Sequence, residues 1–363
     1  MVKTSVESGS ILICLDGFKQ GGTQQAFINI LPDLTSKFSR VYVLIIQKSE
    51  RDLELPNLPN LISLKFDSKR TLDLKLFISL FFLLRKDKPQ LILSSMFRSN
   101  IFMALFKSKR SKLFWMEQNT YFNRTSLQWF IMKILLTKVD KIICISNDVA
   151  NLTRSKFGKR IKYFVIPNPV SGSIKIVELS TKKNDFVFIG RLTEQKQPLV
   201  ALEAFSVFLK KYNEESYLHI VGEGELLINM KERAKKLDVY SRCVFHGFVS
   251  NADVYALLSK TKTLISTSKI EGLAMVRFEA LALGNCIVTT NSGGTDQFFS
   301  RKSNLGVFVS GTDSIEFSTR MLETLSPKYW SVEMINSRIQ IIKKFNSENF
   351  VNSLLSEYLN LRN

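Results

Sequence analysis

Short apolar runs alternate along this chain with longer stretches whose apolar residues recur at helical spacing. In the first half the apolar runs lie at 10–16, 40–46, 61–66, 91–95, 112–118, 141–146 and 163–168. In the second half they lie at 185–190, 217–222, 242–247, 262–267, 285–290 and 305–309. Continuous apolar runs are typical of strands buried on both faces, and their alternation with helices indicates parallel, doubly wound sheets. The pattern predicts an α/β fold of two Rossmann-like domains.

The two series of strands are separated by segment 167–185, in which proline, glycine, serine and charged residues interrupt the rhythm. Because 363 residues exceed one ordinary core, two domains are expected. We predict an N-terminal domain over 1–170 and a C-terminal domain over 171–345. Residues 346–363 have the spacing of an amphipathic helix with Ser347 as N-cap, and we expect this helix to pack back on the N-terminal domain.

The most informative segment, residues 266–297, contains Glu271 and Glu279, eight positions apart. Its spacing predicts a helix over 274–283, which Gly284 ends before the next strand. The first amides of such a helix attract phosphate, and carboxylates on either side suit hydroxyl groups. The pattern fits a nucleotide-sugar, which has phosphate in its middle and a polyol at each end. The alternative is an acid at a helix start and an unrelated, solvated surface acid.

Two cations, Arg191 and Lys196, follow the first strand of the second domain, in FIGRLTEQK. Ligands of doubly wound domains bind beyond the carboxyl ends of strands. The arginine fork and the lysine charge would hold a diphosphate there. The alternative is a pair of surface cations.

Glycine turns follow two other strands. Gly222 and Gly224 lie in VGEGE, and Gly21 and Gly22 precede the first predicted helix. Glycines at these places allow backbone to approach a phosphate or sugar closely, but a simple tight turn requires the same residues.

Composition argues against a zinc site and against a membrane span. Two histidines and four scattered cysteines, without CxxC spacing, are typical of buried free thiols in a reducing compartment. The longest apolar stretch, 76–84, is about half the roughly 20 residues that a span requires, and the N-terminus lacks the layout of a signal peptide. We therefore expect a cytoplasmic protein.

The net charge of +19 is concentrated in the first half. Residues 1–170 hold 27 Lys and Arg against 12 Asp and Glu, whereas residues 171–363 hold 24 against 20. Basic clusters bracket the aromatic segments LFISLFFLL, FRSNIFMALF and YFNRTSLQWF. This combination suits an anionic membrane surface. A solvated basic surface over core aromatics is the alternative, and no nucleic-acid motif accompanies the charge.

Taken in order, FIGRLTEQK, VGEGE, HGFVSNADVYALLS, STSKIEG with Glu279, and NSGG resemble the family 4 glycosyltransferases of GT-B fold. The resemblance covers nearly the full chain, and its most specific element is Glu271-x7-Glu279 combined with Arg191 and Lys196. It implies two Rossmann-like domains facing across a cleft, and a retaining transfer that needs neither metal nor cofactor. The chain agrees in lacking an Asp-x-Asp motif.

The resemblance also implies roles for individual residues. Arg191 and Lys196 would bind the donor diphosphate and stabilise the leaving group, Glu279 would bind the ribose, and Glu271 would bind the donor sugar. The base would lie near Val249. The other donor-binding positions that it implies are Gly21, Gly22, Gly190, Ala274 and Met275.

Three positions depart from the family pattern. Ala274 replaces the second glycine of Glu-Gly-Phe-Gly, and Gln297 stands where an acid is common. Gln118 stands where the family often has histidine. We expect Gln118 to hydrogen-bond the sugar, and neighbouring Glu117 to be either an acceptor base or a structural acid.

These observations lead to a hypothesis of function. We expect a hexosyltransferase that moves a sugar from a nucleotide diphosphate donor, a UDP-sugar, to a lipid-linked glycan acceptor at the inner face of the cell membrane. Its setting would be bacterial surface polysaccharide synthesis, such as O-antigen or capsule. The alternatives are a glycosyltransferase with a soluble or protein acceptor and a non-catalytic nucleotide-sugar-binding protein.

Overall fold

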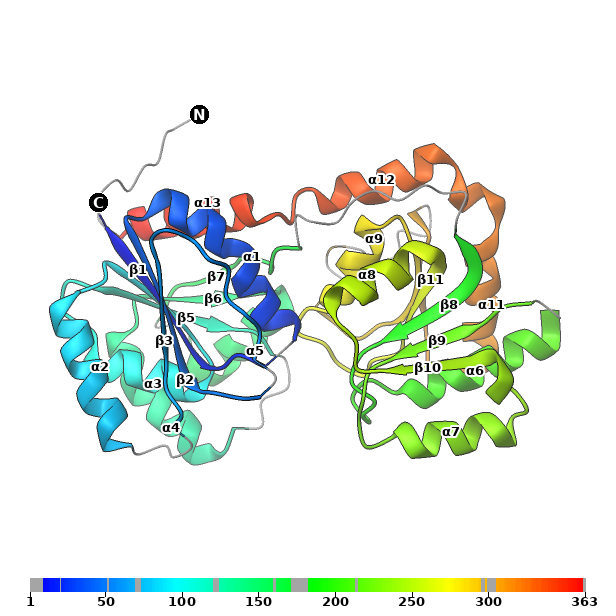
Figure 1. The fold of residues 1–363 in the computed structure, drawn as a ribbon, viewed down its shortest axis with the longest axis horizontal. Helices are drawn as coiled ribbons and strands as arrows, with labels where there is room; N and C mark the ends of the chain where they lie inside the picture. Colours follow the sequence, from blue (N-terminus) through cyan, green and yellow to red (C-terminus); the bar gives the residue numbers. More distant parts are fainter. Residues whose placement is uncertain are drawn as a thin grey trace. The chain divides into compact units, whose positions relative to one another are not determined.

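The chain folds into two compact units, and each contains one parallel sheet (Figure 1). The first unit comprises Met1–Gly172 and Phe345–Asn363, and the second comprises Ser173–Lys344. The boundary falls inside the predicted linker. The computed structural model describes residues 9–19, 21–50, 52–68, 73–119, 124–158, 161–170, 182–212, 215–294, 298 and 305–361.

The first unit is built on a seven-stranded sheet of order β3-β2-β1-β4-β5-β6-β7. Its strands are β1 (Ser10–Gly17), β2 (Arg40–Gln47), β3 (Leu61–Lys65), β4 (Leu91–Ser95), β5 (Lys112–Glu117), β6 (Lys141–Cys144) and β7 (Tyr163–Val165). The helices between them are α1 (Gly22–Lys37), α2 (Leu74–Lys86), α3 (Phe97–Phe106), α4 (Ser126–Leu135) and α5 (Asn147–Phe157). The apolar run at residues 11–15 is wholly buried, as a central strand covered on both faces requires.

The second unit is built on a six-stranded sheet of order β10-β9-β8-β11-β12-β13. Its strands are β8 (Lys183–Ile189), β9 (Leu218–Val221), β10 (Cys243–Gly247), β11 (Thr261–Ser266), β12 (Cys286–Thr290) and β13 (Val307–Ser310). Its helices are α6 (Pro198–Tyr212), α7 (Leu227–Lys236), α8 (Asn251–Lys260), α9 (Met275–Ala282), α11 (Ser314–Leu325) and α12 (Val332–Ile342). The predicted pair of Rossmann-like domains is confirmed, and each strand predicted from an apolar run is present.

The terminal helix α13 (Ser347–Leu359) belongs to the first unit, where it packs on α1. Lys141 Nζ donates to the Glu357 carboxylate at 2.6 Å and ties α13 to β6. The predicted N-cap is wrong by one residue. Asn346 caps the helix, because its side chain accepts from the Asn349 amide at 2.7 Å, and Ser347 is the first helical residue.

All four cysteines are buried free thiols, as predicted. Cys14, Cys144 and Cys286 lie within the apolar strands β1, β6 and β12, and burial raises the pKa of each thiol. They are therefore core residues with little thiolate character.

Each sheet contains one switch point, where the chain leaves one side of the first strand and continues on the other. The switch lies between β1 and β4 in the first sheet and between β8 and β11 in the second. Loops beyond the carboxyl ends of such strands splay apart and leave a crevice for ligands. The predicted site residues are concentrated in these loops.

Candidate functional site

In the second unit, the loop that follows β8 is bonded to the loop that follows β11. Gln195 Nε2 donates to the Ile270 carbonyl at 3.0 Å, and the Lys269 amide donates to the Gln195 carbonyl at 2.8 Å. Thr267 Oγ1 donates to the Lys196 carbonyl at 2.9 Å. The structure therefore brings FIGRLTEQK and STSKIEG together at the switch point.

A buried ion pair joins these two loops. Lys196 Nζ contacts Glu271 Oε1, and Ser268 Oγ donates to the same oxygen at 2.6 Å. Only 7% of Glu271 is exposed. Burial by itself would raise the pKa of Glu271, but the charge and hydrogen bond of Lys196 outweigh it and the pKa is lowered. Glu271 is therefore an ionised carboxylate, ready to accept hydrogen bonds from hydroxyl groups.

Arg191 and Gly190 lie beside this pair at the end of β8. The Arg191 side chain is exposed, and its NH2 donates to Gln195 Oε1 at 3.3 Å. Gly190 has φ +155°, and the Lys196 stem lies 3.6 Å from the place where a Cβ would stand at Gly190. The two cations predicted as a diphosphate clamp thus share one loop, one of them solvated and the other paired.

Arg277 completes this cluster, and the sequence analysis did not select it. Its side chain is 1% exposed, its Nε donates to Ser266 Oγ at 3.0 Å, and its NH2 contacts Ser292 Oγ. Ser292 in turn accepts from the Glu271 amide at 2.8 Å. Arg277 links the end of β11 to the loop after β12, and its charge helps to lower the pKa of Glu271. A lone cation in the apolar run AMVRFEALAL was the available signal.

The glycine turns support these loops by close backbone packing. A Cβ at Gly222 would stand 1.9 Å from the Gly190 carbonyl oxygen, and one at Gly294 would stand 2.3 Å from the Gly272 carbonyl oxygen. Gly222 and Gly294 therefore hold the β8 and β11 loops in place. Gln297 lies outside the described residues.

Glu279 lies on the second turn of α9, in a different environment from Glu271. Burial raises its pKa to about 7, and a hydrogen bond with Tyr255 only partly offsets this effect. Tyr255 belongs to α8, the helix that follows the loop containing Val249. The contact therefore connects Glu279 with the segment predicted to lie near the nucleotide base.

The helix α9 begins at Met275, with Ala274 at the N-cap position and no side-chain hydrogen bond to cap it. Ala274 and Met275 are buried at 3% and 9% exposure. An uncapped helix start presents amide donors to a bound anion. The replacement of glycine by Ala274 is accommodated at φ −78°, a value open to any residue.

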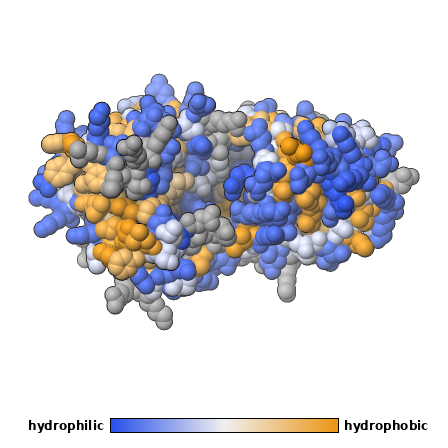
Figure 2. Space-filling view, turned by 90° about the horizontal axis from the view of Figure 1, so that it is seen from below, coloured by the Kyte–Doolittle hydropathy of each residue, from blue (hydrophilic) through white to orange (hydrophobic). Residues whose placement is uncertain are grey.

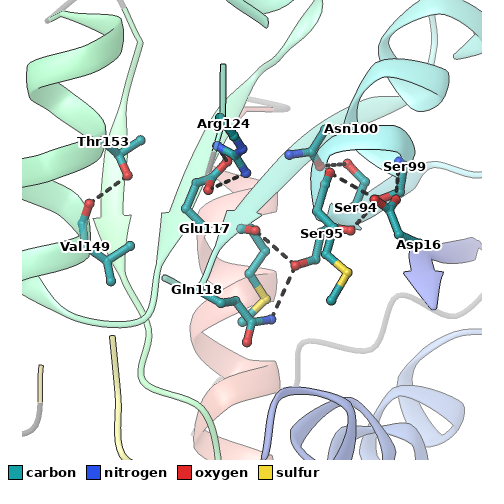
Figure 3. A network of polar contacts seen from close by, with 12 residues as sticks. Asp16, Ser94, Ser95, Ser99, Asn100, Glu117, Gln118, Arg124, Val149 and Thr153 are labelled. Carbon is teal, nitrogen blue, oxygen red and sulfur yellow. Dashed lines mark hydrogen bonds and ion pairs between the residues drawn. The ribbon is translucent and has the colours of Figure 1, made fainter. Parts of the chain in front are cut away.

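In the first unit, polar side chains gather at the carboxyl ends of β1, β4 and β5 (Figure 3). Asp16 accepts from the Arg98 and Ser99 amides at 3.0 and 2.6 Å, at the start of α3. Gly21 is the N-cap of α1, and Gly22 is its first residue. Asp16, near the end of β1, was not predicted as a site residue.

Gln118 is 7% exposed and is held from two sides in this network. Its Nε2 lies 3.5 Å from Ser95 Oγ, and its Oε1 accepts from Asn168 Nδ2 at 3.2 Å. The amide is oriented by elements far apart in the sequence, which makes Asn168 a positioning residue that the sequence did not reveal.

Glu117 is 2% exposed, and its two oxygens accept from Arg124 NH1 and NH2 at 3.2 and 3.0 Å (Figure 3). Burial raises the pKa of Glu117, and the charge of Arg124 opposes that rise. Because both oxygens are engaged by one guanidinium, this geometry favours the structural role over the acceptor base.

The chain belongs to the family 4 glycosyltransferases. The profile of Glycosyltransferase Family 4 matches residues 21–172, and the profile of Glycosyl transferases group 1 matches residues 173–343. The two matches meet at the boundary between the structural units.

Two of the relatives have names that specify a glycan linked to diphosphoundecaprenol. A Campylobacter jejuni GalNAc-α-(1→4)-GalNAc-α-(1→3)-diNAcBac-PP-undecaprenol α-1,4-N-acetyl-D-galactosaminyltransferase is 24% identical over 333 residues, which is 90% of this chain and 91% of that protein. An Escherichia coli UDP-Gal:α-D-GlcNAc-diphosphoundecaprenol α-1,3-galactosyltransferase is 24% identical over 236 residues, covering 61% of this chain and 60% of that protein.

Solved structures show the same fold. Anabaena HepE in complex with UDP aligns with a TM-score of 0.79 and 14% identity, over 97% of this chain and 99% of HepE. The lipopolysaccharide outer core galactosyltransferase WaaB aligns with a TM-score of 0.67 and 17% identity, over 96% and 99%. The fold is GT-B, and the chain is a glycosyltransferase by family.

Proposed function

We propose that this protein is a retaining hexosyltransferase that transfers a sugar from a UDP-sugar to a lipid-linked glycan, at the inner face of the cell membrane. The relatives from Campylobacter jejuni and Escherichia coli support this acceptor class, because both names contain a diphosphoundecaprenol-linked glycan. The name of the Escherichia coli relative and the UDP bound to HepE support uracil as the base of the donor nucleotide. The biological setting is bacterial surface polysaccharide synthesis, such as O-antigen or capsule.

The linkages in those names support retention. UDP-hexoses carry their sugar in the α configuration, and both relatives are named as forming α linkages. An α product from an α donor preserves the configuration at the anomeric carbon.

The observation that carries the proposal is the ionised, buried Glu271, held by Lys196 beside Arg191 at the switch point. A carboxylate in this position is suited to the hydroxyls of a donor sugar. The neighbouring cations and the start of α9 are suited to its diphosphate. Glu279, farther along α9, is suited to the ribose hydroxyls.

In the proposed reaction, the bond between the anomeric carbon and the diphosphate oxygen breaks, and its electron pair leaves with UDP. The acceptor hydroxyl oxygen bonds to the same carbon, and its proton passes to the departing diphosphate oxygen. Negative charge grows on the diphosphate, where Arg191, Lys196 and the α9 dipole stabilise the transition state. Because these groups supply the charge that a metal would otherwise provide, we propose that turnover requires neither metal nor cofactor.

The test compares Lys196→Ala with a matched variant, Lys269→Ala. Lys269 lies in the adjoining loop, but its side chain is 56% exposed and it pairs with the exposed Glu194 at 3.6 Å. UDP release from UDP-hexoses, with a diphosphoundecaprenol-linked acceptor, should fall on the order of a hundredfold or more in Lys196→Ala and stay near wild type in Lys269→Ala.

Three further measurements bear on the proposal. Turnover should persist in EDTA, the product should be the α anomer by NMR, and Arg191→Ala should also be slow. If Arg191→Ala and Lys196→Ala both release UDP and transfer sugar at the wild-type rate, the catalytic assignment is wrong. If wild type binds UDP-hexose but transfers no sugar, the protein is a nucleotide-sugar binder.

A further inference from the structure

Helix α2 turns apolar side chains toward solvent. Leu76, Leu80 and Leu84 are buried and hold the helix on the first unit. On the other side, Ile78 is 49% exposed, Phe81 38% and Phe82 65%. An ordinary surface helix would carry polar residues on that side.

Helix α4 also carries apolar side chains on its exposed side. Leu127, Phe130 and Ile134 recur at intervals of three and four residues, so they lie on one face of the helix. Their exposed fractions are 66%, 61% and 57%, whereas Met132 is buried. The two exposed faces belong to one region of the unit, because α2 and α4 both pack against α3.

We call Ile78, Phe81, Phe82, Leu127, Phe130 and Ile134 the α2–α4 face. Together with Leu105 of α3, these residues make up seven of the fourteen large hydrophobic side chains that are exposed in the described parts of the chain. Figure 2 shows a broad hydrophobic area on this unit. Such a concentration is unusual for a surface that faces only water.

Basic residues surround this face, and acids are nearly absent. Residues 74–138 contain 12 Lys and Arg but only two acids, Asp87 and Glu117. Glu117 is buried against Arg124, and Asp87 lies 3.6 Å from Arg40. Eight of the basic side chains are exposed, namely Lys75, Arg85, Lys86, Lys88, Lys109, Arg110, Lys133 and Lys138.

We propose that the α2–α4 face is a membrane-docking surface, which inserts its apolar side chains into an anionic lipid bilayer while the basic rim contacts the headgroups. This surface would bring the proposed glycosyltransferase to the membrane that contains its acceptor. The proposal rests on the proposed function only for this biological setting. No helix in the described ranges is long and apolar enough to cross a membrane, so contact occurs at one leaflet.

Charge complementarity selects a bilayer over a second copy of this chain. In a symmetric dimer the basic rim would meet its own copy, and like charges repel. Anionic headgroups neutralise the rim, and each basic residue near such a surface strengthens the binding. Aromatic side chains such as Phe82 and Phe130 suit the boundary between headgroups and acyl chains.

The test is flotation of the full-length protein with phosphatidylcholine vesicles, with and without phosphatidylglycerol. Wild type should float with the anionic vesicles, less so as salt is raised. The double variant Phe82→Gln, Phe130→Gln should bind at least about tenfold more weakly. The matched control is Ile228→Gln on α7 of the second unit, where Ile228 is 69% exposed, and it should bind like wild type.

Three results would overturn the docking surface. They are no preference of wild type for anionic vesicles, unchanged binding by the double variant, and a wild-type dimer that the variant converts to monomer by light scattering. UDP release from UDP-hexoses with a diphosphoundecaprenol-linked acceptor in detergent, without vesicles, is measured in parallel. If the double variant loses flotation while wild type and variant both release no UDP, the docking surface stands and the proposed function fails.

Discussion

At the scale of single residues, the two glutamates of the Glu-x7-Glu pattern prove to be chemically different. Glu271 is kept ionised by Lys196, whereas the pKa of Glu279 is raised to about 7 by burial. The sequence presents both as equivalent acids. The difference arises because Lys196, 75 positions before Glu271, is folded against only one of them.

The raised pKa of Glu279 predicts a pH-dependent affinity for UDP. Ribose hydroxyls donate to a carboxylate, so only the ionised form of Glu279 accepts both. Affinity for UDP should rise about tenfold between about pH 6 and pH 8. In Glu279→Gln, whose side chain does not ionise, the affinity for UDP should be weaker and should lack the rise with pH that ionisation of Glu279 causes. Calorimetric titration with UDP measures the affinity of both proteins at each pH. UDP itself also titrates in this range, and its contribution is removed by comparing the pH dependence of wild type with that of Glu279→Gln.

The same pKa predicts how stability changes with pH. Because the folded state holds the proton of Glu279 more tightly than the unfolded state, stability falls as pH rises from about 4.5 to about 7. Glu279→Gln should therefore gain stability relative to wild type across this window. A difference in stability between Glu279→Gln and wild type that is the same at both ends of the window would contradict the raised pKa of the buried carboxyl.

At the scale of elements, the loops after β8 and β11 are positioned by glycines, whose lack of a side chain lets two backbone segments touch. Gly222 has φ +133° and sits against the Gly190 carbonyl. The sequence alone could not decide between this role and contact with a ligand, because both require the same residue.

Gly222→Ala should lower the melting temperature by several degrees more than Gly247→Ala does. Each kcal/mol of lost stability corresponds to a fall of roughly 2–4 °C. The matched Gly247 also has positive φ, +65°, but no atom within 4 Å of its added Cβ. The comparison separates backbone strain from the clash with Gly190. UDP binding should weaken in Gly222→Ala alone, and equal effects of the two substitutions would contradict the packing role.

Strands were predictable because their signal is local. A run such as residues 11–15 is apolar throughout, and a chain segment of that kind must be covered on both faces. The end of a helix is less determined by local sequence, since Asn346 and Ser347 are both good N-caps, and the structure has Asn346 in this position.

At the scale of the whole molecule, one chain carries two Rossmann-like units, and the second contains the residues proposed to bind the donor, namely Arg191, Lys196, Glu271 and Glu279. We expect UDP, but not GDP or ADP, to raise the melting temperature of the protein. A ligand at a hundred times its dissociation constant adds about 2.7 kcal/mol of stability. Scanning fluorimetry measures the shift, with Lys196→Ala as the control that should respond weakly. A larger shift with GDP would contradict the uracil assignment and leave the family unchanged.

The amino-acid sequence by itself determined the two sheets, the order of their strands along the chain, and the positions of Arg191, Lys196, Glu271 and Glu279, because apolar runs and glycine-flanked motifs are local. Only the tertiary structure decided which partners these residues meet. It paired Lys196 with Glu271, placed Arg277 beneath them, joined Glu117 to Arg124, and left the α2–α4 face exposed. The physical reason is that burial, which sets pKa and exposure, depends on residues distant in the sequence.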